Sequence, residues 1–141
     1  MSRLLAVILL LFLSLASAKE GGWDHRASFN LKKDRWQSVE IHEGERVHVL
    51  KFRWTLYKNG GLIMHVRYGK RRFQPLLSMQ YRLDAFKIEL FPKADDASRT
   101  QFETPYALIV FKAFDEEGGR AYLDLMIRDY GMSEIFYTEG K

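Results

Sequence analysis

The fold of this chain is decided by residues 46–68, which read RVHVLKFRWTLYKNGGLIMHVRY. Apolar and polar side chains alternate along residues 46–57, and the alternation resumes along residues 62–68 after Asn59-Gly60-Gly61. A period of two residues is typical of a half-buried β-strand, and two such runs around a glycine-containing turn predict a β-hairpin.

The length of the hairpin loop sets which residues of the two strands lie opposite one another. A two-residue turn at Asn59-Gly60 would place Trp54 opposite the polar His65. A three-residue loop places Trp54 opposite Val66 and keeps one apolar face continuous along the hairpin. We therefore expect the three-residue loop, with Gly61 in the left-handed conformation that such a loop requires.

A second hairpin is predicted where residues 106–114 and 121–130 flank the charged segment 115–120. Both runs alternate, and a three-residue loop at 116–118 brings their apolar faces together. This loop requires Gly118 in the left-handed conformation. The expected cross-strand pairs are Phe111 with Leu123, Ile109 with Leu125, and Ala107 with Ile127.

Residues 76–91 permit two interpretations. Apolar residues fall on odd positions up to Leu83 and on even positions from Phe86, which predicts a strand with a β-bulge near residues 84–85. The alternative is a helix opened by Pro75, because several of these residues also approximate helical spacing. We favour the strand because the segment is rich in strand-preferring residues.

These patterns predict an all-β, mostly antiparallel fold: a small β-sandwich or open barrel built from hairpins, with at most one short helix. A short strand is expected near residues 28–31 and a last strand at residues 133–137. Residues 92–105 form the one long polar stretch and are interpreted as a connecting loop.

The N-terminus has the pattern of a cleavable secretory signal. Arg3 provides a positive charge, residues 4–13 are uniformly apolar, and Ala16-Ser17-Ala18 provides small residues for cleavage after Ala18. An uncleaved anchor is the alternative, but the apolar run is shorter than the ~20 residues that cross a bilayer. We expect residues 1–18 to be a signal peptide and residues 19–141 a single β-rich exported domain without a transmembrane segment.

Composition favours a bacterial periplasm, and a location outside the cell is the alternative. Removing Arg3 from the 22 Lys and Arg residues leaves 21, against 18 Asp and Glu, so the exported domain carries a formal net charge of +3. The chain has no Cys and no Asn-x-Ser/Thr sequence, so it lacks the usual marks of passage through an endoplasmic reticulum.

Few residue patterns point to catalysis. His42 and His48 are six positions apart, whereas the two histidines of a zinc-protease helix are four apart. There is no Cys and no Gly-x-Ser-x-Gly, so a nucleophile motif is absent from the sequence. We expect no metal, no cofactor and no catalytic residue.

Carboxylate pairs would suit glycoside cleavage, and four acidic residues are candidates for it. Asp124 is expected opposite Val110, on the strand face turned away from Leu123, where a carboxylate would be solvated. The four residues are Asp84, Glu89, Asp124 and Glu134.

The basic cluster at the far end of the first hairpin is the main candidate for binding. With the expected register, Arg53 lies opposite Arg67, and arginine forks bind phosphate and carboxylate groups through paired hydrogen bonds. The alternative is a solvated strand end whose cations discourage edge-to-edge aggregation. Tyr57 joins the candidates because its strand phase is opposite to that of Trp54. Tyr122 and Tyr130 also lie on this opposite phase, so either a second layer covers that face or the aromatics are displayed to a partner. The candidate binding residues are Arg53, Arg67, Lys70, Arg71, Arg72 and Tyr57.

We therefore expect a non-catalytic periplasmic binding module whose partner is an envelope protein or an anionic envelope component, and not nucleic acid. One alternative is a small-ligand carrier, in which Phe52, Met64 and Phe111 would line an apolar barrel cavity. A carbohydrate-active enzyme is the other.

Overall fold

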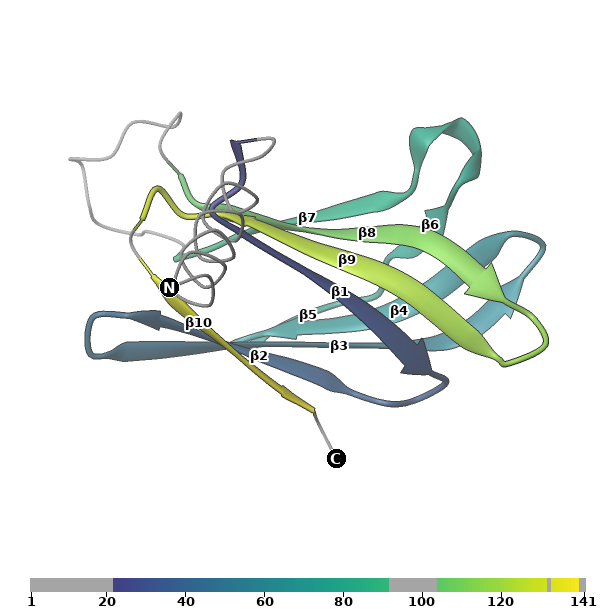
Figure 1. Ribbon diagram of the computed structural model, residues 1–141, viewed down its shortest axis with the longest axis horizontal. Helices are drawn as coiled ribbons and strands as arrows, with labels where there is room; N and C mark the ends of the chain where they lie inside the picture. The colour runs from purple at the N-terminus through teal and green to yellow at the C-terminus, as the bar shows by residue number, and fades with distance from the viewer. Residues whose placement is uncertain (1–21, 92–103, 132, 140–141) are drawn as a thin grey trace, which may run out of the picture.

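The protein is a sandwich of two antiparallel β-sheets, which Figure 1 shows one above the other. The computed structural model describes residues 22–91, 104–131 and 133–139. One sheet has four strands in the order β1-β9-β8-β7, and the other has six, in the order β10-β2-β3-β4-β5 with β6 also paired to β4. The all-β expectation is confirmed. The strands are β1 (His25–Lys32), β2 (Gln37–Glu43), β3 (Arg46–Lys58), β4 (Gly61–Tyr68), β5 (Arg71–Phe73), β6 (Leu76–Ser78), β7 (Ala85–Glu89), β8 (Tyr106–Asp115), β9 (Arg120–Arg128) and β10 (Glu134–Glu139).

The core lies between the two sheets and is built from every second residue of the long strands. Phe52 and Met64 of the six-stranded sheet and Phe111 and Leu123 of the four-stranded sheet are completely or almost completely buried. Burying a side chain of this size contributes about 1.5–3 kcal/mol to folding. The side chains that alternate in the sequence are therefore the ones that pack the two sheets together.

The first hairpin forms with a different loop from the one expected. Asn59 and Gly60 make a two-residue turn with φ values of 53° and 78°, which is the backbone of a type I′ turn. Trp54 lies opposite Met64 and not opposite Val66, and Gly61 has no positive φ. The three-residue loop was therefore wrong.

A β-bulge between Trp54 and Leu56 explains how the apolar face survives the shorter turn. The extra residue, Thr55, moves the rest of β3 to the opposite face. Leu56 therefore turns outward and is 46% exposed, while Tyr57 turns inward and stacks on Phe114 with ring centroids 3.8 Å apart. The expectation that Tyr57 is displayed on the face opposite Trp54 was wrong for the same reason.

In the second hairpin, the three expected residue pairs are confirmed. The loop differs, because residues 116–119 make a four-residue turn and Gly119, not Gly118, has the positive φ of 62°. A β-bulge between Phe111 and Ala113 compensates for the longer loop.

The segment 76–91 is neither a single strand nor a helix. Strand β6 pairs with β4, the 3₁₀-helix η2 (Gln80–Arg82) follows, and β7 then pairs with β8. The chain thus crosses from one sheet to the other, which Figure 1 shows at the upper right. Ile88 and Leu90 are buried, so the expected even-numbered apolar face of this segment is confirmed.

Two terminal strands complete the sandwich. Strand β1 is longer than the expected 28–31 and pairs with β9, and β10 forms near the expected position and pairs with β2. The predicted signal peptide and most of the predicted loop at 92–105 lie outside the described residues.

The turn of the first hairpin gives a test of its backbone. Gly60→Ala is expected to lower the free energy of unfolding by about 1–2 kcal/mol, because a Cβ is strained at positive φ. Gly61→Ala is the control and should cost less than half as much, because Gly61 has no positive φ, and its new Cβ would meet the end of the Leu76 side chain at 3.1 Å and the Lys58 carbonyl oxygen at 3.4 Å. Urea denaturation measures both changes, and a larger loss in the Gly61 variant would contradict the turn assignment.

Candidate functional site

The outer face of the six-stranded sheet carries a group of neighbouring cations. Cross-strand pairing places Lys51 of β3 opposite Arg67 of β4, and Arg67 opposite Arg72 of β5. Directly opposite residues share a face, so these three side chains form one row across the sheet. Arg53 lies two residues along β3 on the same face, opposite His65. We call Lys51, Arg53, Arg67 and Arg72 the cation cluster.

Trp36 lies beneath two of these arginines. The guanidinium carbon of Arg53 is 4.6 Å from the centroid of the Trp36 ring, and that of Arg67 is 4.9 Å away. Both distances fall within the range of cation–π attraction, which for two arginines on one indole also restricts their rotamers. The side chains of Arg53 and Arg67 are thus ordered on the surface before any ligand binds.

The turn between β1 and β2 brings Trp36 to this place. Asp34 has a φ of 61°, and its amide donates a hydrogen bond to the carbonyl of Trp54 on β3 at 2.9 Å. The turn is thereby fastened to β3 just beyond Arg53. The sequence did not predict this contact, because Trp36 and Arg53 are 17 positions apart and their contact has no periodic signal.

The charges of the cation cluster are not neutralised within the part of the chain that the structure describes. No carboxylate of those residues lies within ion-pair distance of its four members. The Nε atom of Arg53 is also buried without a hydrogen-bond acceptor among them. A buried donor without an acceptor costs about 1–3 kcal/mol, so holding Arg53 in this position lowers the stability of the fold.

The structure brings together only some of the predicted site residues. Arg53, Arg67 and Arg72 share the outer face, although Arg53 faces His65 and not Arg67 as expected. Lys70 is exposed in the turn between β4 and β5. Arg71 belongs to the other strand phase, where its guanidinium lies 5.0 Å from the Phe73 ring.

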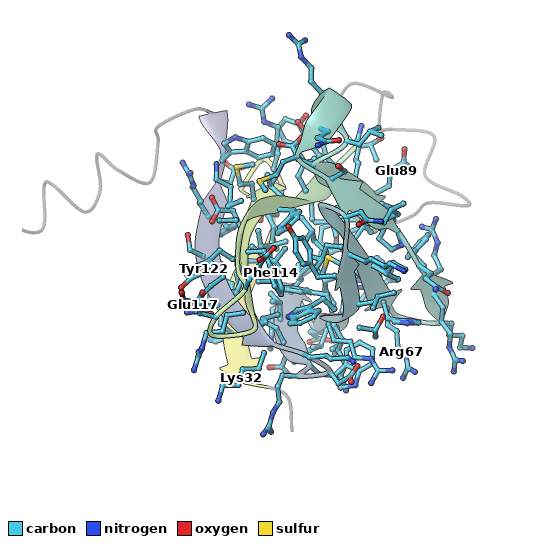
Figure 2. All side chains as sticks on the ribbon, turned by 90° about the vertical axis from the view of Figure 1, so that its right-hand side faces the viewer. Lys32, Arg67, Glu89, Phe114, Glu117 and Tyr122 are labelled. Atoms are coloured by element: carbon cyan, nitrogen blue, oxygen red, sulfur yellow. The ribbon has the colours of Figure 1, made fainter. Side chains whose placement is uncertain are left out.

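The remaining changes to the predicted site follow from the bulge in β3. Tyr57 lies on the inner side of the sheet, away from the cation cluster. Lys51 was missed because the expected register set Arg53 opposite Arg67. Of the two alternatives left open for Tyr122, display applies, since it is 39% exposed, but Figure 2 shows it on the opposite side of the molecule from Arg67.

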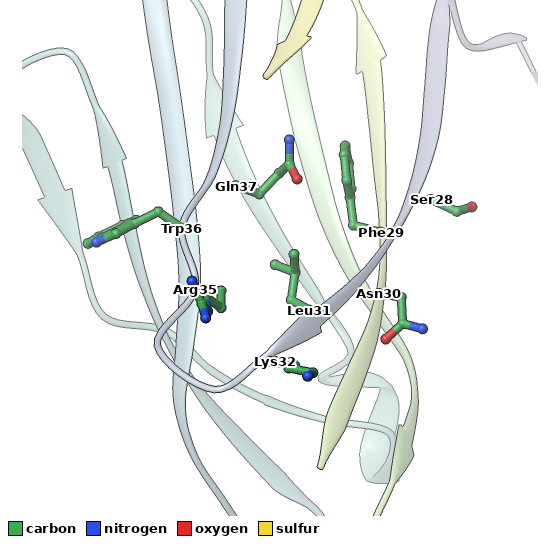
Figure 3. A pocket seen from close by; sticks show the side chains of 8 residues that line it. All are labelled: Ser28, Phe29, Asn30, Leu31, Lys32, Arg35, Trp36 and Gln37. Carbon is green, nitrogen blue, oxygen red and sulfur yellow. The ribbon is translucent and has the colours of Figure 1, made fainter. Parts of the chain in front are cut away.

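A groove of about 490 Å³ opens beside β1 and the start of β2. In Figure 3 the side chains of Phe29, Leu31 and Gln37 point into the space between the strands, whereas Trp36 points away on the other side of β2. Its lining also includes Ser28, Asn30, Lys32 and Arg35.

The groove is not the barrel cavity that a carrier would need. Neither sheet closes on itself within the described residues. Phe52, Met64 and Phe111 are buried in the packed core and do not line the groove.

The four carboxylates considered for glycoside cleavage lie on different sheets. Asp84 precedes β7, Glu89 ends it, and Asp124 is on β9, whereas Glu134 begins β10 of the other sheet. The groove contains none of them. A second hollow of about 320 Å³ includes only Glu134.

Asp124 differs from its expected state. It faces Val110, as predicted, but it is only 7% exposed. Its carboxylate accepts a hydrogen bond from the Ser28 hydroxyl at 2.8 Å and pairs with Arg26 at 3.3 Å. The expectation of a solvated carboxylate was wrong, because β1 supplies two partners across the sheet.

Asp129 joins three chain segments at the end of β9. Its Oδ2 accepts hydrogen bonds from the hydroxyl of Ser133 and from Nε2 of His25, the latter at 2.8 Å. Its Oδ1 accepts the amide of Gly131 at 2.9 Å. A catalytic triad requires the histidine to contact the serine, whereas here both bind the same carboxylate oxygen. The cluster therefore fixes the connection from β9 to β10.

Hydrogen bonding controls the ionisation of Asp129. Burial by itself would raise the pKa of this carboxyl, but the hydrogen bonds from Ser133 and Gly131, together with His25, outweigh burial and lower the pKa from its usual 3.8.

The histidines do not form a metal site among the described residues, where no three His, Asp or Glu side chains gather closely enough to hold an ion. His42 lies 3.5 Å from Glu40, and His48 lies 3.9 Å from Glu43. The ring of His48 packs between Tyr68 and Phe91, with centroid distances of 6.0 and 4.8 Å.

Comparison with known proteins adds no identity. The chain matches no protein-family model, no curated protein and no solved structure. Within residues 22–91, 104–131 and 133–139, no helix has the length and apolar character needed to cross a membrane.

The hydrogen bonds to Asp129 predict how the stability of the fold depends on pH. Because the folded-state pKa lies below 3.8, the ionised carboxylate stabilises the fold fully above that pH and loses its effect as the pH falls through the lower value. Asp129→Asn is expected to lower the free energy of unfolding by about 1–3 kcal/mol near neutral pH. It should also flatten the loss of stability on the acid side.

Denaturant titrations from pH 7 down to pH 2 measure both effects. Ser133→Ala is the comparison, since it removes one donor and leaves the charge. A neutral-pH stability equal to that of the parent protein in the Asn variant would rule out this role for Asp129.

Proposed function

We propose that this protein is a non-catalytic binding module of the bacterial envelope that holds an anionic group on the cation cluster. The observation that carries the proposal is the pair of arginines stacked on Trp36 without a carboxylate partner among the described residues. The predicted export signal places such a module where anionic lipids, polymers and acidic proteins are all present.

The position of the cations in the sheet supports binding over protection against aggregation. Cations that discourage edge-to-edge pairing are needed on edge strands. Arg72 is on the edge strand β5, but Lys51, Arg53 and Arg67 are on the interior strands β3 and β4. Edge protection therefore accounts for one member of the cluster and leaves three unexplained.

The chemistry of the cluster favours phosphate or carboxylate oxygens. Arginine presents several N–H groups in a planar fork that matches both groups, and hydrogen bonds between charged groups are stronger than neutral ones. Since Arg53 and Arg67 are already ordered on Trp36, an anion would not have to restrict their rotamers on binding.

Inositol hexakisphosphate, a soluble polyphosphate, provides a probe for this site in isothermal titration calorimetry. Arg53→Ala/Arg67→Ala is expected to weaken its binding at least about tenfold, since each charge-assisted hydrogen bond is worth about 1.5–3 kcal/mol. Lys32→Ala/Lys112→Ala is the matched control, because it removes the same charge from the four-stranded sheet.

Two further variants separate geometry from charge. Arg53→Lys/Arg67→Lys keeps both charges but loses the planar forks, and Trp36→Leu removes the ring beneath them; both should weaken binding. Equal losses in the cluster and control variants would mean that the probe responds to net charge alone, and the proposal would fail.

A further inference from the structure

The outer face of the six-stranded sheet carries exposed aliphatic side chains next to the cation cluster. Leu56 of β3 lies opposite Ile63 of β4, and Ile63 lies opposite Leu76 of β6. The next or preceding residue on each strand faces the core: these residues are Tyr57, Leu62 and Leu77. The row itself therefore points outward. We call Leu56, Ile63 and Leu76 the apolar row.

The apolar row is open to solvent. Leu56 is 46% exposed and Leu76 is 64% exposed, while Ile63 is half-buried between them. A Cβ added at Gly61 would lie 3.1 Å from the end of Leu76, so this side chain lies against the sheet beside the row. Such exposed apolar residues gathered side by side are typical of a surface that meets a partner.

The apolar row and the cation cluster follow one another along the same strands. On β4 the outward residues are Ile63, His65 and Arg67, in that order, and four residues of strand span about 13 Å. The opposite end of this outer face is different, because it carries Glu40 and Glu134 with the exposed Val47 and Phe136. The face therefore has one basic and apolar end and one acidic end.

We propose that the basic and apolar end binds an anionic lipid surface. The cation cluster would contact lipid phosphates, and the apolar row would enter the layer just below them. This inference rests on the proposed function and names its partner. A phospholipid surface presents anionic groups and acyl chains within one thin layer, so a single partner accounts for both features.

The arrangement also predicts an orientation. Glu40 and Glu134 would be repelled by lipid phosphates, so that end of the sheet should tilt away from the surface. The sandwich would then meet the surface through β3, β4, β5 and β6, with β10 raised from it.

Sedimentation with lipid vesicles tests the inference. The protein is expected to bind vesicles that contain phosphatidylglycerol and phosphatidylcholine, and not vesicles of phosphatidylcholine alone. Binding should fall as salt is added, because salt screens attraction between exposed charges. Each cation near an anionic surface changes the binding constant about fivefold, so Arg53→Ala/Arg67→Ala should lose most of the binding.

The apolar row is tested separately from charge. Leu56→Ser/Leu76→Ser is expected to lower vesicle binding about tenfold while binding of inositol hexakisphosphate is unchanged. Val47→Ser/Phe136→Ser is the matched control, since these side chains are similarly exposed on the acidic end of the same face. Circular dichroism and thermal unfolding establish that each variant is folded.

The outcomes distinguish the two proposals. If the protein binds inositol hexakisphosphate but not anionic vesicles, or if the two serine double variants behave alike, the lipid inference is overturned and the anion site stands. Binding to polyglutamate in preference to vesicles would point to an acidic protein and would also overturn it. If neither the phosphate probe nor the vesicles bind, both proposals fail.

Discussion

The β-bulge between Trp54 and Leu56 is the constraint on which the rest of the surface depends. Before it, Phe52 and Trp54 fill the core, and after it the inward position passes to Tyr57. A one-residue shift exchanges every later side chain between the two faces of a strand. The shift turns Leu56 outward. Leu56, Ile63 and Leu76 therefore form one row on the face that also holds the cations.

The sequence predicted an antiparallel all-β fold, either a sandwich or an open barrel, but not the register of its first hairpin, and the reason is physical. Alternation reports only which face a residue occupies, and a three-residue loop without a bulge satisfies the same pattern as a two-residue turn with one. The Asn59-Gly60 turn was rejected because it broke the apolar face without a bulge, although type I′ turns favour this dipeptide strongly. Since the register was shifted, Arg53 was set opposite Arg67 and the contribution of Lys51 was missed.

The remaining features escaped prediction because they join distant parts of the chain. Trp36 reaches Arg53 and Arg67 through the turn between β1 and β2, and Asp129 meets His25 across 104 residues. Neither contact has a period or a motif that a sequence reveals. The crossing at β6 and β7 is a similar case, since its buried apolar residues belong to two different sheets, and the expected core residues Met79 and Leu83 between them are exposed.

The cation cluster also has an energetic cost, which among the described strands the opposed pair Lys32 and Arg120 of the four-stranded sheet shares. Elsewhere Arg26 pairs with Asp124, Arg128 donates to the carbonyl of Gly22, and Lys87 lies over Tyr106. Like charges directly opposite one another in a sheet are destabilising, yet Lys51, Arg67 and Arg72 stand in one row. Cation–π contact with Trp36 offsets part of this repulsion for Arg67 and Arg53, but it leaves their charge in place. An anion above the row would remove the repulsion directly, so the free energy stored in the row becomes available for binding.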